Sequence, residues 1–102
     1  MSFRVRFTAA ALADLQRLYA FFMTRDISDW PLAERALDAI LHGIDLLEHS
    51  PFSCRKSSAG DSFLRELLIP FGASGYLALF EIDDDKTVTV LAVRHQREDD
   101  YH

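Results

Sequence analysis

The sequence predicts an α+β domain with the element order β-α-α-β-β-β, in which a helical hairpin packs on an antiparallel sheet. Apolar and charged residues alternate over residues 3–7, as in a half-buried strand. Apolar residues then recur at three- and four-residue spacing up to residue 49, and beyond residue 62 the period returns to two. Helices and strands with one apolar face bury it economically as two layers, so we expect the helix pair to cover one face of the sheet.

The first strand is expected over residues 3–7, FRVRF, and a helix follows it directly. Thr8 is the predicted N-cap, because its hydroxyl can accept a backbone N–H of the first turn. The alanines after it favour a helix, which we expect to reach about residue 24. The apolar face of this helix is predicted to comprise Leu12, Leu15, Tyr19 and Phe22.

A second helix is expected after a connection over residues 25–30, since Pro31 suits the first turn of a helix. It is predicted to end at His49-Ser50-Pro51, because the residue before a proline is pushed out of the α region. Its packing face is predicted to be Ala33, Leu37, Ile40, Ile44 and Leu47.

Residues 51–62 are predicted to form a loop, and three strands are expected to follow it. Pro70 should end the first of them, and Asp83-Asp84-Asp85-Lys86 should form the turn between the last two. The strands are expected at residues 63–69, 75–82 and 87–95.

Composition limits the class of protein. The 102 residues, 49% of them apolar, suit one domain spanning residues 1–102. No stretch approaches ~20 uninterrupted apolar residues, the start lacks a secretory leader core, and Cys54 stands alone, so a cytoplasmic protein without membrane contact is expected. A net charge of −5 with scattered basic residues disfavours direct DNA binding.

Motifs along nearly the whole chain resemble the RelE/ParE superfamily of bacterial toxins. In order they are a first helix of the form AxADLxxLYxF, a second helix ending LLEHSP, then GDSFLREL, GYLALFEID and VTVLAVRHQREDDY. The last motif is the most specific and lies closest to the ParE branch, often labelled plasmid stabilisation proteins. The resemblance implies the toxin of a type II toxin–antitoxin pair, in a hetero-oligomer with a ParD-like antitoxin. It implies DNA gyrase as the target in the ParE branch and mRNA cleavage on the ribosome in the RelE branch.

A RelE-like endoribonuclease would need acid/base groups and cations around the scissile phosphate. The resemblance would assign these roles to His95, Arg65 and Arg94, without a metal ion or other cofactor. Regular alternation in the last strand groups Arg94 with Val88, Val90 and Ala92, and His95 with Leu91 and Val93. Arg94 and His95 then point to opposite faces, and both serve one site only if the strand ends between them. We therefore prefer inhibition by binding over catalysis.

A binding toxin needs a surface for its partners. The residues expected to contribute to partner binding are Arg65, Arg94, His95, Arg97 and Tyr101. The aromatic residues expected to be core residues, or else interface anchors, are Trp30, Phe52, Phe71 and Tyr76.

Three further hypotheses carry less weight. A metal site at His42, Asp45 and His49 is disfavoured, because these residues fit a solvated helix face. Basic neighbours of Cys54 could lower its pKa, but an ordinary loop thiol is preferred. A toxin-fold module without activity is a third alternative for the function.

Overall fold

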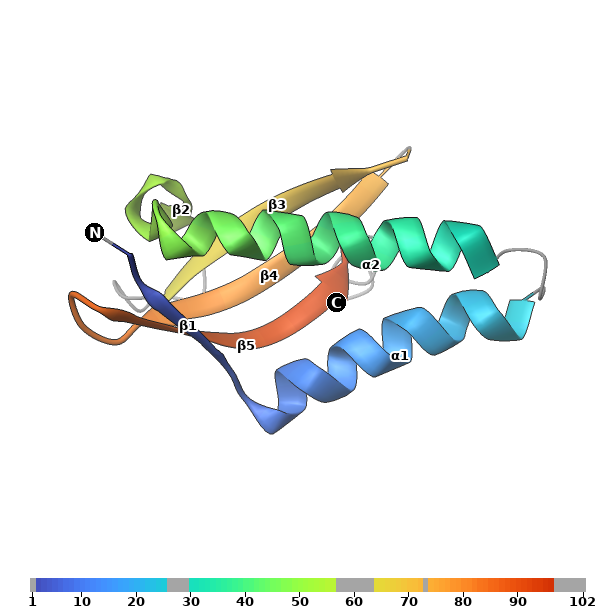
Figure 1. The fold of residues 1–102 in the computed structure, drawn as a ribbon, viewed down its shortest axis with the longest axis horizontal. Helices are drawn as coiled ribbons and strands as arrows, with labels where there is room; N and C mark the ends of the chain where they lie inside the picture. Colours follow the sequence, from blue (N-terminus) through green and yellow to red (C-terminus); the bar gives the residue numbers. More distant parts are fainter. Residues whose placement is uncertain (1, 26–29, 57–63, 73, 97–102) are drawn as a thin grey trace.

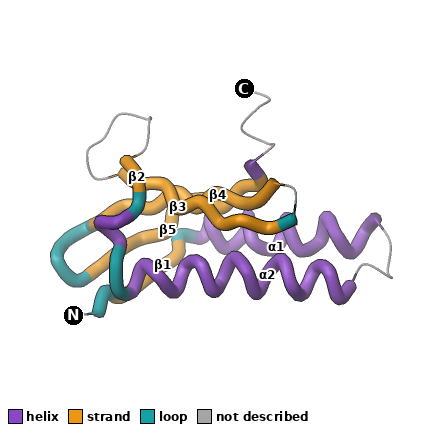
Figure 2. The backbone as a smooth tube through the Cα atoms, turned by 90° about the horizontal axis from the view of Figure 1, so that it is seen from above, coloured by secondary structure: helices purple, strands orange, loops and turns teal. Residues whose placement is uncertain are grey.

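The computed structural model describes residues 2–25, 30–56, 64–72 and 74–96. Within these ranges two α-helices form one layer and five strands form the other (Figure 1; Figure 2). The elements are β1 (Arg4–Phe7), α1 (Ala9–Arg25), α2 (Trp30–Asp45), β2 (Arg55–Lys56), β3 (Leu64–Phe71), β4 (Ser74–Ile82) and β5 (Thr87–His95). No helix in the described ranges combines the length and the apolar character needed to cross a membrane.

The predicted α+β fold is confirmed, with one correction to the sheet. The strand order is β1-β5-β4-β3-β2, and the pairs from β2 to β5 are antiparallel. The first strand instead runs parallel to the last, with residues 4–7 beside residues 87–90. The sheet is therefore mostly antiparallel, because the N-terminal strand joins the edge left by the C-terminal hairpin instead of pairing with its neighbour in sequence.

Several predicted boundaries differ from the structure. The predicted loop after α2 contains the short strand β2, which pairs with residues 65–66 of β3. Pro70 lies inside β3 and does not end it. Among the described residues, the short strand β2 pairs only with residues 65–66 of β3, so β3 is an edge strand at Pro70. A proline, which has no N–H, is tolerated there because no neighbouring strand needs that hydrogen bond. The predicted turn is confirmed, since the N–H of Asp83 donates to the carbonyl of Thr87 over 2.9 Å.

The α2 segment ends in two steps. The α-helix stops at Asp45, and a 3₁₀ turn over Leu46–Glu48 continues the chain. The carbonyl oxygen of Leu46 accepts the N–H of His49 at 3.1 Å, which is the tighter hydrogen bond of a 3₁₀ turn. The predicted packing face of this segment is confirmed, because Leu37 is half-buried and the other four residues are buried.

Helix α1 begins as predicted but buries a different face. The N–H of Ala11 donates to Thr8 Oγ1 over 3.0 Å, which confirms the N-cap. Leu12 is 50% exposed, whereas Ala11 and Leu18 are buried. The predicted stripe is therefore wrong at Leu12, because the small side chain of Ala11 allows the helix to approach the sheet closely on that side. The side chain of Phe22 lies outside the described part of the structure.

The core lies between the helices and the sheet. Its largest fully buried side chains include Phe80 and Tyr76 of β4, Ile40 of α2 and Val93 of β5. Gly43 of α2 packs against β3, where a Cβ atom would lie 3.0 Å from the side chain of Ile69. This close approach of α2 to β3, together with that of α1 to β5, holds the helical layer on the sheet.

Candidate functional site

A β-bulge interrupts the last strand where sequence alternation alone predicted a regular one. Leu79 of β4 pairs with Ala92 of β5, whereas the next residue of β4, Phe80, pairs with Val90. Leu91 is therefore an extra residue without a partner on β4. A bulge of this kind shifts the alternation of side chains by one position for the rest of the strand.

The bulge decides which face each candidate residue occupies. Val93 and His95 join Val90 on the side of the helices, and Arg94 lies on the other side, which we call the open face. The expectation that Arg94 and His95 point to opposite faces is confirmed, since β5 continues through His95. The predicted grouping of Arg94 with Val88 and Val90 is wrong, because the extra residue precedes it.

His95 packs against the core at the end of β5. Its imidazole meets the ring of Tyr76 edge-on, with 5.3 Å between the ring centroids and 87° between the planes. The side chain of Gln96 donates to the carbonyl oxygen of Tyr76 over 3.4 Å. Burial raises the pKa of the Tyr76 phenol, so this neighbour of His95 stays protonated at neutral pH.

Arg65 has a structural role in the loop that leads into β2. Its Nη1 donates to the carbonyl oxygens of Cys54 (2.7 Å) and Phe52 (3.3 Å), and the guanidinium lies over the Phe52 ring at 5.4 Å from the centroid. Its Nε is buried and has no hydrogen-bond partner among the described residues. Arg65 thus ties residues 51–54 to β3.

The three residues proposed for RNA cleavage do not converge. Arg65 pairs with Phe80 of β4, four positions along the ladder from Tyr76, the partner of His95. Four strand residues span about 13 Å. Arg94 lies on the open face, on the opposite side of the sheet from both.

The open face carries an apolar patch with basic residues near it. Among the described residues its apolar members are Leu64, Leu68, Pro70, Leu77, Leu79 and Ala92, its exposed basic members are Arg4, Arg6, Arg55 and Arg94, and Glu66 and Glu81 lie on it as well. Leu68 is 44% exposed. These leucines alternate with core residues along β3 and β4, so the sequence pattern indicates that they share one face of the sheet. The pattern does not indicate which of the two faces the helices cover.

A second apolar surface, the hairpin groove, lies between the two helices. It is a hollow of about 330 Å³ lined by Leu15, Gln16, Tyr19, Glu34 and Leu37. The Tyr19 hydroxyl donates to Glu34 Oε1 over 3.0 Å and bridges the helices. Leu12 of α1 and Leu41 of α2 lie on the same faces as the lining residues, one or two helical turns away from them. The two leucines are 50% and 40% exposed.

The remaining predicted residues have different surroundings. Tyr76 is buried and Phe71 packs against the core, as expected, but Phe52 is 60% exposed. The side chain of Trp30 and the whole of residues 97–102, which include Arg97 and Tyr101, lie outside the described residues. Within the described ranges no three His, Cys, Asp or Glu residues are grouped as metal ligands would be.

Cys54 agrees with the preferred interpretation as an ordinary thiol, and the alternative of a pKa lowered by basic neighbours is wrong. Burial raises the pKa of the thiol, and the charge of Arg65 opposes this in part. Its sequence neighbour Arg55 instead pairs with Glu66, with 3.1 Å between Nε and Oε1. A thiol with a raised pKa is a weak nucleophile at neutral pH.

Comparison with known proteins agrees with the fold and with the motifs. The family described as the ParE toxin of the type II toxin–antitoxin system parDE matches residues 5–100. Toxin RelE3 of Caulobacter vibrioides is 35% identical over 89 residues, which are 86% of this chain and 88% of the relative.

Solved structures share the architecture. A chain of the chromosomal ParDE system from P. aeruginosa superposes with a TM-score of 0.72 at 17% identity, over 92% of this chain and 96% of that one. A chain of the RelBE2 toxin–antitoxin complex from Mycobacterium tuberculosis gives 0.65 at 24% identity, over 94% and 100%. With a family match over almost its whole length, this chain belongs to the ParE toxins of type II toxin–antitoxin systems.

Proposed function

We propose that this toxin acts by binding a protein target, DNA gyrase, and that a ParD-like antitoxin neutralises it by occupying a surface of the toxin. The observation that supports binding over RNA cleavage is the separation of Arg65, Arg94 and His95. A phosphoryl-transfer site needs its acid/base group and its cations within hydrogen-bond reach of one phosphate. Here one guanidinium holds backbone carbonyls and the other lies across the sheet from the imidazole.

The open face is the proposed surface for the target. It combines the exposed Leu68 and half-buried leucines of β3 and β4 with Arg94 and with the two arginines of β1, Arg4 and Arg6. Such a combination suits a protein partner, because apolar area supplies affinity while arginines orient an acidic surface and raise the association rate. Arg94 of β5 pairs with Leu77 of β4, so a positive charge lies directly beside apolar area on this face.

The hairpin groove is the proposed surface for the antitoxin. Its lining is mostly apolar, Glu34 of α2 supplies an acidic group there, and the exposed Asp38 lies one turn further along α2. An amphipathic helix with a leucine stripe and flanking lysines or arginines would complement both properties. The structural neighbours from P. aeruginosa and M. tuberculosis belong to toxin–antitoxin systems, which supports an antitoxin as the occupant and a hetero-oligomer as the assembly.

A supercoiling assay tests the target. The purified toxin should inhibit supercoiling by gyrase, and the double variant Leu68→Glu/Arg94→Glu should lose most of that inhibition, because it removes apolar area and reverses a charge on the open face. Arg35→Glu, an exposed charge reversal on α2, is the matched control and should inhibit like the wild type. Full inhibition by the double variant would exclude the open face as the target surface.

The second candidate function is ribosome-dependent mRNA cleavage, which the relative named Toxin RelE3 favours. A translating extract separates the two functions. Codon-positioned mRNA cuts that disappear in the His95→Ala variant, together with unimpaired gyrase, would establish the ribonuclease. Loss of gyrase activity with intact mRNA supports the binding toxin.

A further inference from the structure

We propose that Thr8 and Asp14 of the α1 region are positioning residues that hold the bulge at Leu91 and thereby place Arg94 on the open face. The inference rests on the proposed function in one respect, since it assigns these residues a part in presenting Arg94 to the target. Its structural part, the control of the bulge, stands on hydrogen bonds alone.

The bulge lies where β5 loses its neighbour. In the described part of the chain, β1 pairs with β5 only up to the Phe7–Val90 pair. The next polar groups on that edge belong to residues 91–93, beside the first turns of α1. Buried backbone N–H and C=O groups without partners are costly, so this edge needs substitutes for the missing strand.

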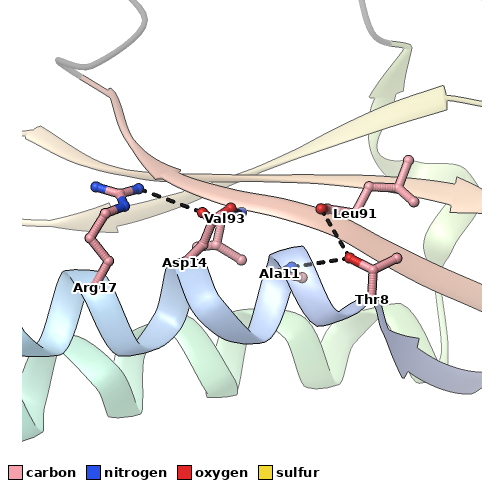
Figure 3. A network of polar contacts seen from close by, with 6 residues as sticks. All are labelled: Thr8, Ala11, Asp14, Arg17, Leu91 and Val93. Carbon is pink, nitrogen blue, oxygen red and sulfur yellow. Dashed lines mark hydrogen bonds and ion pairs between the residues drawn. The ribbon is translucent and has the colours of Figure 1, made fainter.

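Side chains of the α1 region supply those substitutes (Figure 3). The Thr8 hydroxyl donates to the carbonyl oxygen of Leu91 over 3.2 Å, and the N–H of Val93 donates to Asp14 Oδ2 over 3.0 Å. The N–H of Thr8 also donates to the carbonyl oxygen of Val90 at 3.1 Å. Three successive hydrogen bonds thus bracket the extra residue, and we call this set the bulge clamp.

Both clamp residues are held in place by α1 itself. Thr8 Oγ1 accepts the N–H of Ala11 as the helix N-cap while its own hydroxyl hydrogen reaches β5. The second oxygen of Asp14 faces Arg17, with 3.8 Å between Oδ1 and Nη2. The clamp is therefore built on a helix turn, which fixes its position along β5.

The apolar run around Leu91 does not by itself select the bulged register. Residues 90–93 read Val-Leu-Ala-Val, so an apolar residue occupies every position whether or not Leu91 is extra. In a regular register Phe80 would still pair with Val90, but Tyr76 would pair with Arg94 instead of His95. A one-residue slip exchanges the two faces and would turn the exposed Arg94 toward the helices, so the side preferred by Arg94 and the polar contacts of the clamp together distinguish the registers.

Nuclear magnetic resonance of the purified toxin tests the clamp. The wild type should show a nuclear Overhauser signal between the rings of His95 and Tyr76, and this signal should vanish in Asp14→Ala. The amide of Val93 should exchange its hydrogen roughly tenfold to a hundredfold faster in that variant, as expected for a buried donor without an acceptor. Asp14→Asn keeps an acceptor oxygen and should retain both the ring signal and the slow exchange.

Two controls separate positioning from general destabilisation. Arg17→Gln removes the ion pair of Asp14 but leaves the clamp, and Ile44→Val weakens the core beneath α2, the helix that packs on β3; both should keep the Overhauser signal between His95 and Tyr76. A variant that merely destabilised the protein would resemble Ile44→Val. Retention of the ring signal in Asp14→Ala would overturn the proposal.

Removal of Leu91 provides a rescue. Without the extra residue, Ala92 still pairs with Leu79 in a regular strand, so the faces of Arg94 and His95 no longer depend on the bulge. The protein lacking Leu91 should keep the ring signal even with Asp14→Ala, including when Asp14→Ala alone does not fold. Absence of the ring signal from this double variant would count against the clamp.

The gyrase assay distinguishes this inference from the proposed function. If both hold, Asp14→Ala should lose most of its inhibition while Asp14→Asn and Ile44→Val retain it. If the wild type does not inhibit gyrase, the proposed function fails, and the resonance measurements still decide whether the clamp exists. Unchanged inhibition by an Asp14→Ala protein that no longer shows the ring signal would remove the functional part of the inference.

Discussion

Replacing Arg65 with methionine should destabilise the fold, because Arg65 ties a loop to the sheet. Hydrogen bonds to a charged donor contribute about 1.5–3 kcal/mol, and Arg65 Nη1 makes two with the carbonyls of Cys54 and Phe52. Its contact with the exposed Phe52 ring adds about 0.5–1 kcal/mol. The buried Nε without a described partner costs desolvation that methionine relieves, so we expect a net loss of about 2 kcal/mol.

Equilibrium urea denaturation measures this loss. With a slope of about 1–2 kcal/mol per molar for a protein of this size, the midpoint should fall by roughly 1–2 M. Lys56→Met is the matched control, since Lys56 is exposed on the strand beside Arg65, and its effect should stay within about 0.5 kcal/mol. A change below that limit in Arg65→Met would refute the tether. Loss of toxicity at unchanged stability would instead assign Arg65 a direct functional role.

Four further predictions concern Cys54, Gly75 and His95. Alkylation of Cys54 in the folded protein should rise at a higher pH than in the urea-unfolded chain, because burial raises the thiol pKa above the ordinary 9.0. The same shift should make stability fall as pH rises past about 9, since the unfolded chain then binds fewer protons, and urea midpoints across this range check it. Gly75→Ala should cost at least about 1–3 kcal/mol in the same denaturation assay, because its Cβ would lie 2.3 Å from the carbonyl oxygen of Ile69. His95→Ala should inhibit gyrase within about twofold of the wild type; a tenfold loss, or about 1.4 kcal/mol, would place the imidazole in the interface.

The helices and the long strands could be predicted from the sequence because their signals are local. An N-cap hydroxyl at Thr8, an apolar stripe along α2 and two-residue alternation in β4 each depend on a few neighbouring residues. The C-terminal motif likewise indicated the toxin family without any knowledge of the fold. Short elements were harder, since the two residues of β2 have no period of their own and depend on pairing with β3.

The sequence by itself determined the order of the elements, the packing face of α2 and the family of the protein. Only the tertiary structure decided how the candidate residues are arranged. The bulge at Leu91 depends on the side chains of Thr8 and Asp14, about 80 positions away in the chain. Local periodicity therefore predicted the wrong residues to share a face of the sheet with Arg94. Likewise, the role of Arg65 follows from carbonyls that face it across a loop. Such hydrogen bonds form between residues that folding alone brings together, and no pattern along the chain encodes them.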